Sequence, residues 1–372
     1  MNFVYINTGD LINERKFMVS LGRLVFRATG VMSKKGIVKN CKKVGQRVAE
    51  RMQETGGRIE NKEIQQILSD TIGKKAASKI KITGDKESFL EACRKNLGLP
   101  DNVSEYMYAN SLSAAIPARG NGALVNLRLA ELSNKQIANL SSHELEHGLY
   151  YSFSSSAKKA RLINKTSWGR KLIDKMMKKA PEVNEKGIVL QTKLVSEIGN
   201  LGCSAIGFTK GTSSISTLLK KSGCKSKKEL QEKIRQMLYG ENIVSAGKEK
   251  DNAFVLKQLI GGLKDEKRAY TTGAFSEKYW NNIQGEDLKG LVSKSELNAT
   301  LYGEAIKVLK QELRHTRLNQ VKRFFGLKPN TAREQAIIKQ QQVSETEKLS
   351  FTKVTKNDFN GKIKEKLFEN KE

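Results

Sequence analysis

The feature that most limits what this chain can fold into is a helix-forming stretch that carries the pattern H-E-x-x-H. It begins with the capping-box residues Ser133 and Gln136, which satisfy free backbone groups at the start of a helix. Apolar residues then recur near helical spacing, which predicts a helix from about Asn134 to about Tyr151. His143 and His147 stand one turn apart and therefore share one face of this helix.

This pair of histidines predicts metal chemistry. The chain contains only 3 histidines, and two of them form the pair. Two imidazoles one turn apart can bind one Zn²⁺ from the same side. Glu144 follows the first histidine and can reach a metal-bound water as general base. The alternative reading is a solvated helix face with two incidental histidines. We predict a zinc centre with His143 and His147 as ligands and Glu144 as the catalytic base.

A strand is expected just before the motif helix. Apolar and polar residues alternate within Gly122–Ala130, which is the pattern of a half-buried strand. An extended peptide can pair along a free strand edge. We therefore expect the strand around Val125–Leu129 to hold a substrate over the metal.

A zinc ion bound by two histidines needs a third protein ligand and an open position for water. We prefer Glu266, because the small residues Ala269 and Gly273 on the same helix allow a close approach to the motif helix. Tyr270, one turn after Glu266, lies on the ligand face. It can steady a histidine or donate a hydrogen bond to a developing oxyanion. The alternative reading of Glu266 is an exposed charge on a surface helix.

Other third ligands remain open at this stage. Glu197, near an expected helix end, is the main alternative to Glu266. Glu182 and Glu185 lie in an expected loop and are further candidates. His315 lies on a basic face and is expected at the surface.

The two motifs together resemble the gluzincin metallopeptidases, and most closely the CAAX-prenyl endopeptidase family and its soluble relatives. That family carries H-E-x-x-H on one helix and E-x-x-A-D-x-x-G on another. The corresponding runs here are His143-Glu144-x-x-His147 and Glu266-x-x-Ala269-Tyr270-x-x-Gly273. The run Glu131–Ile137 is also similar to the family's lead-in to its motif helix.

The resemblance implies a zincin-like core and a zinc-dependent endopeptidase. It implies His143, His147 and Glu266 as the metal ligands and Glu144 as the general base. The chain departs from the family at Tyr270, where the family has aspartate. It also has a long insertion between the two motifs and no flanking membrane spans.

The composition favours helices, because only 4 prolines occur in 372 residues. We predict an α+β fold that is predominantly helical, with a small sheet beside the motif helix. Three regions are expected: a basic helical N-terminal region (1–100), a metallopeptidase core (101–290) with an insertion at about 165–250, and a basic helical C-terminal region (291–372). We expect helices to end near Pro181 and to be interrupted at Gly261 and Gly262.

The formal net charge is +28, which suits nucleic acid, anionic membrane surfaces or acidic proteins as partners. Lysines crowd residues 34–51 and the C-terminal tail. The alternative reading is lysine spread over solvated faces, and no nucleic-acid-binding motif accompanies the charge. A competing function is therefore a basic protein that binds an acidic partner or nucleic acid and carries a degenerate metal site. A bacterial effector that delivers a peptidase combines both functions.

The expected compartment is the cytoplasm. The 4 cysteines are scattered and form no C-x-x-C motif, which favours a reducing compartment. No secretory signal is evident at the N-terminus, and no run approaches the roughly 18 apolar residues of a membrane span. Export by a signal-less route remains compatible with this pattern.

Overall fold

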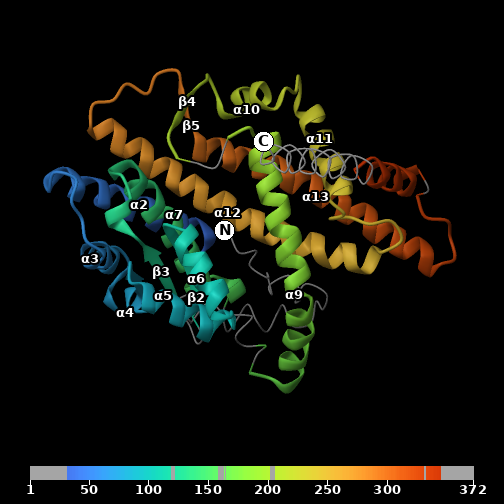
Figure 1. Ribbon diagram of the computed structural model, residues 1–372, viewed down its shortest axis with the longest axis horizontal. Coiled ribbons are helices and arrows are strands. Elements are labelled where there is room, and N and C mark those ends of the chain that lie inside the picture. Colours follow the sequence, from blue (N-terminus) through green and yellow to red (C-terminus); the bar gives the residue numbers. More distant parts are fainter. Residues whose placement is uncertain are drawn as a thin grey trace, which may run out of the picture.

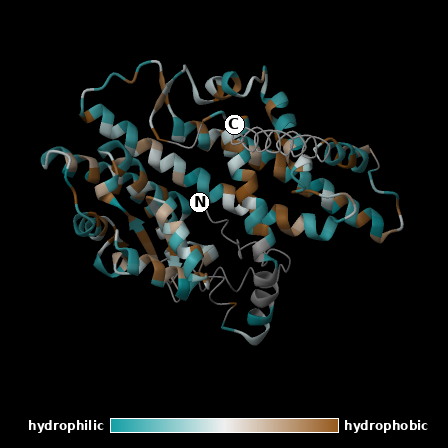
Figure 2. Ribbon diagram, in the orientation of Figure 1, coloured by the Kyte–Doolittle hydropathy of each residue, from teal (hydrophilic) through white to brown (hydrophobic). Residues whose placement is uncertain are grey.

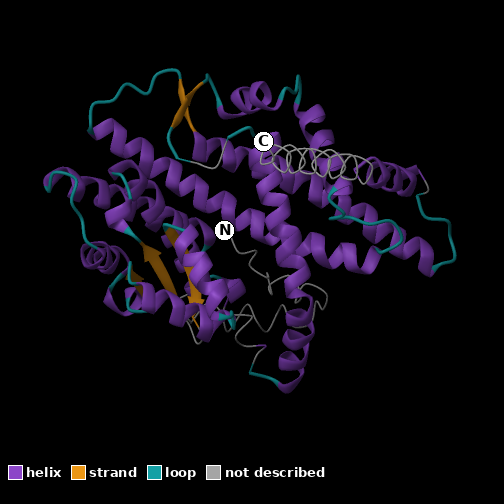
Figure 3. Ribbon diagram, in the orientation of Figure 1, coloured by secondary structure: helices purple, strands orange, loops and turns teal. Residues whose placement is uncertain are grey.

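The computed structural model describes residues 32–118, 122–157, 163, 165–201, 206–330 and 332–344. Within these residues the protein is predominantly helical and contains a small mixed sheet, as the composition and patterning predicted (Figure 3). The predicted elements within residues 1–31 and the charged tail after residue 344 lie outside the described residues.

In the part of the chain that the structure describes, helices follow one another with short strands between them. The α-helices are α2 (Lys34–Glu54), α3 (Asn61–Ile72), α4 (Lys74–Ala77), α5 (Lys86–Ala92), α6 (Asp101–Asn110), α7 (Asn134–Phe153), α9 (Ser167–Lys193), α10 (Ser214–Ser222), α11 (Lys227–Gly240), α12 (Glu249–Ile283) and α13 (Lys294–Phe324). Three short turns of other helix types are η2 (Cys93–Leu97), η3 (Leu129–Glu131) and η4 (Leu194–Ile198). The strands are β1 (Ile80–Thr83), β2 (Ser113–Ala118), β3 (Gly122–Leu127), β4 (Phe208–Lys210) and β5 (Leu291–Ser293).

The long helix α12 crosses the middle of the molecule (Figure 1). One hydrophobic cluster joins α2, α3, α7 and the sheet to Trp280 of α12. A second cluster joins α9, α10, α11 and α13 to the stretch of α12 around Leu259. Figure 2 shows hydrophobic residues along α12 and the sheet, and hydrophilic residues over the outer helices. Helix α12 therefore supports both halves of the core.

The three-stranded sheet corrects two predictions about the strand before the motif helix. Strand β3 ends at Leu127, and the chain then turns into η3, so the strand is shorter than Gly122–Ala130. The strand order is β1-β3-β2, with β1 parallel and β2 antiparallel to β3. Strand β3 is therefore central, and the expectation that it offers a free edge to substrate is wrong. Strands β1 and β2 are the two edges of this sheet.

The alternation of polar and apolar residues in β3 does not mark a solvent face. Val125 packs in the cluster shared with α7, and Leu124 packs with Phe89 of α5 on the opposite side. Asn126 is fully buried. Helices cover both faces of this strand, so a polar residue in the alternating pattern is not necessarily exposed to solvent.

Two predicted helix breaks are also wrong. Helix α9 continues through Pro181, and α12 runs unbroken through Gly261 and Gly262. Each glycine costs a helix about 1 kcal/mol relative to alanine. Leu190, which follows Pro181 in α9, and Leu259 and Leu263, on either side of the two glycines in α12, are buried in the core. Their packing outweighs the local preference.

The turn predicted at 97–101 is present, and Gly98 there has a φ of 66°, in the left-handed region. The sheet and a hydrophobic cluster extend across this turn. Strand β1 pairs with β3, and Phe89 packs in one cluster with Met107. Residues 165–250, predicted as an insertion, form α9, α10 and α11 and pack on α12 and α13.

Candidate metal centre

The site is built on α7, whose start and length match the sequence prediction. The backbone N–H of Gln136 donates to Ser133 Oγ at 3.4 Å, and the N–H of Ser133 donates to Gln136 Oε1 at 2.8 Å. This capping box begins a helix over Asn134–Phe153. From Ser141 to Phe153 every residue is buried. The H-E-x-x-H motif therefore lies inside the molecule and not on a solvated face.

Helix α12 passes close to α7, as the small residues near Glu266 suggested. A Cβ atom added to Gly273 would lie 2.5 Å from Asn139 Oδ1 and 3.3 Å from the Asn139 carbonyl oxygen. Those separations are shorter than van der Waals contact. A side chain at this position would force Asn139 to move, so glycine favours the close crossing, which lies two turns of α12 after Glu266.

His143, His147 and Glu266 converge at the crossing. His143 Nε2 lies 3.8 Å from Glu266 Oε2, and His147 Nε2 lies 3.7 Å from Glu266 Oε1. One donor atom from each of the three residues lies within 4.8 Å of the others. Two donors on one tetrahedral zinc ion lie about 3.4 Å apart, given bonds of about 2.1 Å. The three side chains can therefore hold a metal ion with only small adjustments.

The electrostatic environment of these residues suits a cation. Burial raises the pKa of Glu266 to about 7. Burial lowers the pKa of His147, but the carboxylates of Glu266, Asp265 and Glu144 outweigh it and raise that pKa to about 10. Burial, followed by the charge of His147, holds the pKa of His143 well below its ordinary value. A positive charge between the rings is stabilised by the surrounding carboxylates.

Glu144 points from α7 toward β2. Ser113 Oγ donates a hydrogen bond of 2.9 Å to Glu144 Oε1, and the backbone of Ala115 also hydrogen-bonds the carboxylate. Burial raises the pKa of Glu144. This carboxylate is thus held between the metal-ligand group and an edge of the sheet. No sequence signal pointed to Ser113.

Tyr270 lies on the ligand face of α12, at the predicted position. Its ring is 4.7 Å from the ring of His143, centroid to centroid, in an edge-to-face arrangement. On the other side it approaches Tyr302 of α13, whose ring centroid is 5.6 Å away. A hydrogen bond joins the two tyrosine side chains. Tyr270 therefore lies against a candidate metal ligand and is anchored to α13.

A second charged group lies behind His147, and the sequence reasoning missed it. Asp265 Oδ2 is 3.3 Å from His147 Nδ1. Arg268 Nε donates to Glu146 Oε1 at 2.6 Å, and Arg268 also pairs with Asp265. Glu146, His147 and Asp265 also lie close enough to hold an ion, but the guanidinium of Arg268 already balances both carboxylates. The hydrogen bond to Nδ1 leaves Nε2 of His147 directed at Glu266.

The other sequence candidates lie elsewhere. Glu197 is in η4 and pairs with Lys193 on the surface. Glu182 and Glu185 are exposed on α9, which is a helix where a loop was expected. His315 is exposed on α13. Among the described residues, none of these four belongs to a group that can hold an ion.

Comparison with protein families, curated proteins and solved structures found no match to this chain. The fold and site therefore define the protein: it is predominantly helical, and it has a buried histidine and glutamate group that can hold a metal ion. No helix in the described part of the chain has the length and apolar character that crossing a membrane requires.

Proposed function

We propose that this protein is a zinc-dependent endopeptidase with a zincin-like core. The observation that carries the proposal is the convergence of His143, His147 and Glu266 beside a buried Glu144. Two histidines and one glutamate, with a fourth position open to water, form a donor set typical of catalytic zinc. Bound zinc would polarise the scissile carbonyl and lower the pKa of a bound water to about 7.

Glu144 is the general base in this proposal. It accepts the proton of the attacking water and passes it to the leaving amine. Its hydrogen bonds to Ser113 and Ala115 fix the carboxylate, and its raised pKa suits a group that gives the proton back. Tyr270 holds the ring of His143 in place through their edge-to-face contact. Its hydroxyl is the candidate donor to an oxyanion, after release from Tyr302.

The substrate in this proposal is a protein or peptide, held by β2 in place of β3. Strand β2 pairs with β3 on one side and is an edge strand of the sheet. An extended peptide can add to such an edge through backbone hydrogen bonds. The contacts of Ser113 and Ala115 with Glu144 place this strand beside the proposed base.

The substitution Glu144→Gln tests the proposal. We expect zinc content to stay at the wild-type level while peptide hydrolysis falls by about 100-fold or more, because general base catalysis contributes about 10²–10⁴. The measurements are metal analysis of the purified protein and mass spectrometry of a peptide mixture incubated with it. Glu185→Gln, on the exposed side of α9, is the control and should cleave normally.

The competing function is a basic binding protein whose metal site is degenerate. It predicts that wild type binds zinc yet leaves every peptide of the mixture intact. It also predicts that Glu144→Gln changes neither the zinc content nor the result of the peptide incubation. Either result would remove the endopeptidase proposal, while the metal site itself would stand.

A further inference from the structure

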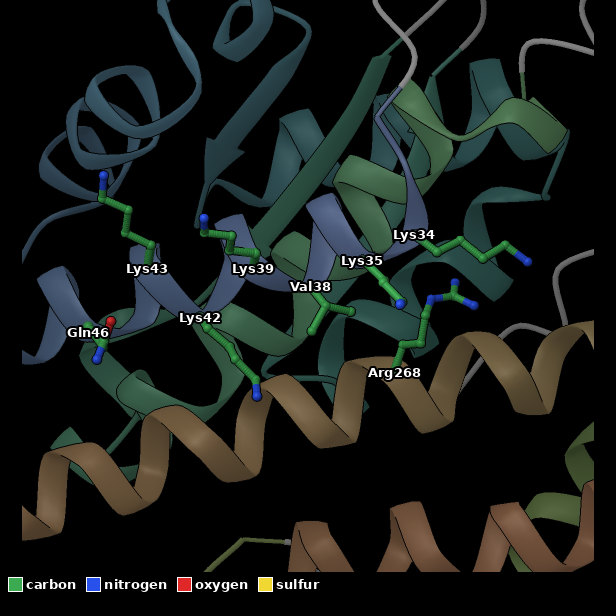
Figure 4. Close-up of a pocket in the computed structure, with 8 residues that line it drawn as sticks. All are labelled: Lys34, Lys35, Val38, Lys39, Lys42, Lys43, Gln46 and Arg268. Carbon is green, nitrogen blue, oxygen red and sulfur yellow. The ribbon is translucent and has the colours of Figure 1, made fainter. Parts of the chain in front are cut away.

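A groove lined by positive charge runs between α2 and α12, with a volume of about 670 Å³. We call it the basic groove and define it by its cationic residues Lys34, Lys35, Lys39, Lys42, Lys43 and Arg268 (Figure 4). Val38 and Gln46 complete its lining, so no carboxylate lies among the described residues that form it. The metal-ligand group uses none of these residues.

Three of the six cations of the basic groove have no carboxylate partner among the described residues. Lys35, Lys39 and Lys43 are exposed and take part in no ion pair among the described residues. Arg268 differs, because Glu146 and Asp265 already balance its charge. Like charges so close together repel one another, so an anionic ligand that binds all of them relieves this repulsion.

The lysines form two rows along α2. Figure 4 shows Lys42 directed toward α12, whereas Lys39 and Lys43 point to the opposite side, with Val38 nearer α12. The ammonium group of Lys42 also lies 4.6 Å from the centre of the Phe275 ring. Lys39 and Lys43 are one helical turn apart, which is about 6 Å along the axis.

This spacing matches an extended polypeptide. Side chains on one side of an extended chain recur about every 6.6 Å, and successive side chains point to opposite sides. A run of Asp or Glu residues along α2 can therefore place alternate carboxylates on the two rows of lysines.

We propose that the basic groove binds an acidic segment of another polypeptide in extended conformation. Nucleic acid fits less well for two reasons. None of the described residues that line the groove is aromatic, so they give bases no stacking platform there. Arg268, whose guanidinium has the shape best suited to a phosphate, is already paired with buried carboxylates.

The experiment measures binding of a fluorescently labelled peptide of ten glutamates to the full-length protein by anisotropy at low salt. The test variant carries Lys35→Glu, Lys39→Glu and Lys43→Glu. The matched control carries Lys225→Glu, Lys227→Glu and Lys228→Glu, three exposed lysines at the start of α11. Both variants have the same net charge. We expect the test variant to lose about tenfold or more in affinity and the control about twofold at most, because screening limits distant charges.

A ten-nucleotide single strand of thymidines is the second probe. Binding of this strand as tightly as the peptide, with the same dependence on the groove lysines, would overturn the proposal. Equal losses of peptide affinity in the two variants would also overturn it, because binding would then depend on net charge alone. Circular dichroism and melting curves check that each variant is folded. Should the charge reversal unfold the chain, the corresponding Lys→Gln variant takes its place.

The inference does not depend on the proposed peptidase. The same titration on Glu144→Gln protein treated with a chelator should give the same affinity. Loss of peptide binding there would place the binding site at the metal group and not in the groove.

Discussion

Arg268 shows at the level of single residues how the buried charges of this site are tolerated. Glu146 is fully buried, and Asp265 is nearly so. A buried carboxylate without a partner is costly, whereas one paired with a hydrogen-bonded guanidinium is tolerated. Arg268 contacts both carboxylates, and Asp265 contacts His147. The orientation of one candidate ligand thus depends on an arginine outside the metal group.

We predict that Arg268→Met destabilises the fold by about 3–5 kcal/mol, because it leaves the buried carboxylate of Glu146 without its ion-pair partner and leaves Asp265 with His147 alone. Urea unfolding measures the change. Arg51→Met is the control, because its side chain is 45% exposed and its ion pairs lie at the surface. That control should change the free energy of unfolding very little, because exposed ion pairs contribute little to stability. Similar losses in the two variants would show that Arg268 is not the partner on which these charges depend.

The metal ligands give a second prediction at this scale. We expect His143→Ala and Glu266→Ala to reduce the zinc content of the purified protein, because each removes one of the three donors. Glu197→Ala should keep the wild-type content, because Glu197 lies in a surface ion pair away from the site. Loss of zinc in the Glu197 variant alone would transfer the third-ligand role to that residue.

At the scale of elements, the crossing of α7 and α12 is held by a second buried carboxylate. Glu277 of α12 is fully buried and accepts hydrogen bonds from Asn139 of α7 at 3.1 Å and from Ser293 of β5 at 2.9 Å. The backbone N–H of Gly207 also donates to it. Strands β4 and β5 pair as a two-stranded sheet, and this carboxylate therefore connects that sheet to the helix pair that carries the candidate ligands.

Glu277 should make stability depend on pH in an unusual direction. Burial raises its pKa above the ordinary value of 4.5, despite the hydrogen bonds that lower it. The folded state therefore holds this proton more tightly than the unfolded state does. Relative to Glu277→Gln, wild type should lose stability as pH rises from 4.5 through the raised pKa, by at most about 1.4 kcal/mol per pH unit.

Urea unfolding of both proteins at several pH values measures this difference. Glu185→Gln, which removes an exposed carboxylate from α9, serves as the control. The prediction would be contradicted if the free energy of unfolding of wild type increased relative to that of Glu277→Gln as the pH rises.

On the scale of the whole molecule, the candidate metal centre lies where the two halves of the core meet. Its histidines belong to α7, in the half that contains the three-stranded sheet, and Glu266 belongs to α12, which reaches into both halves. An ion bound there would link α7 to the helix that supports the whole fold.

Zinc should therefore raise the melting temperature of the entire chain. A ligand that binds only the folded state stabilises it by about 2.7 kcal/mol when its free concentration is about 100 times the Kd. Thermal unfolding followed by circular dichroism, with and without zinc, measures the shift. His143→Ala should show little shift, and an equal shift in that variant would mean that zinc acts at another site.

The features that depend on neighbours along the chain could be predicted from the amino-acid sequence. The capping box of Ser133 and Gln136 and the spacing of His143 and His147 predicted α7 and its paired imidazoles, because both act within a few residues. The predominance of helix followed from composition. The choice of Glu266 also used local information, since a close helix crossing requires a residue as small as Gly273.

The tertiary structure alone decided which groups surround these residues. No pattern in the chain places Arg268 against Glu146, or Ser113 against Glu144, because each pair joins segments whose proximity depends on packing. Packing also made β3 a central strand and carried α12 through Gly261 and Gly262 against their local preference. Local propensities amount to about 1 kcal/mol per residue. Burial of several large apolar side chains contributes more, so the core overrides the local signal wherever the two conflict.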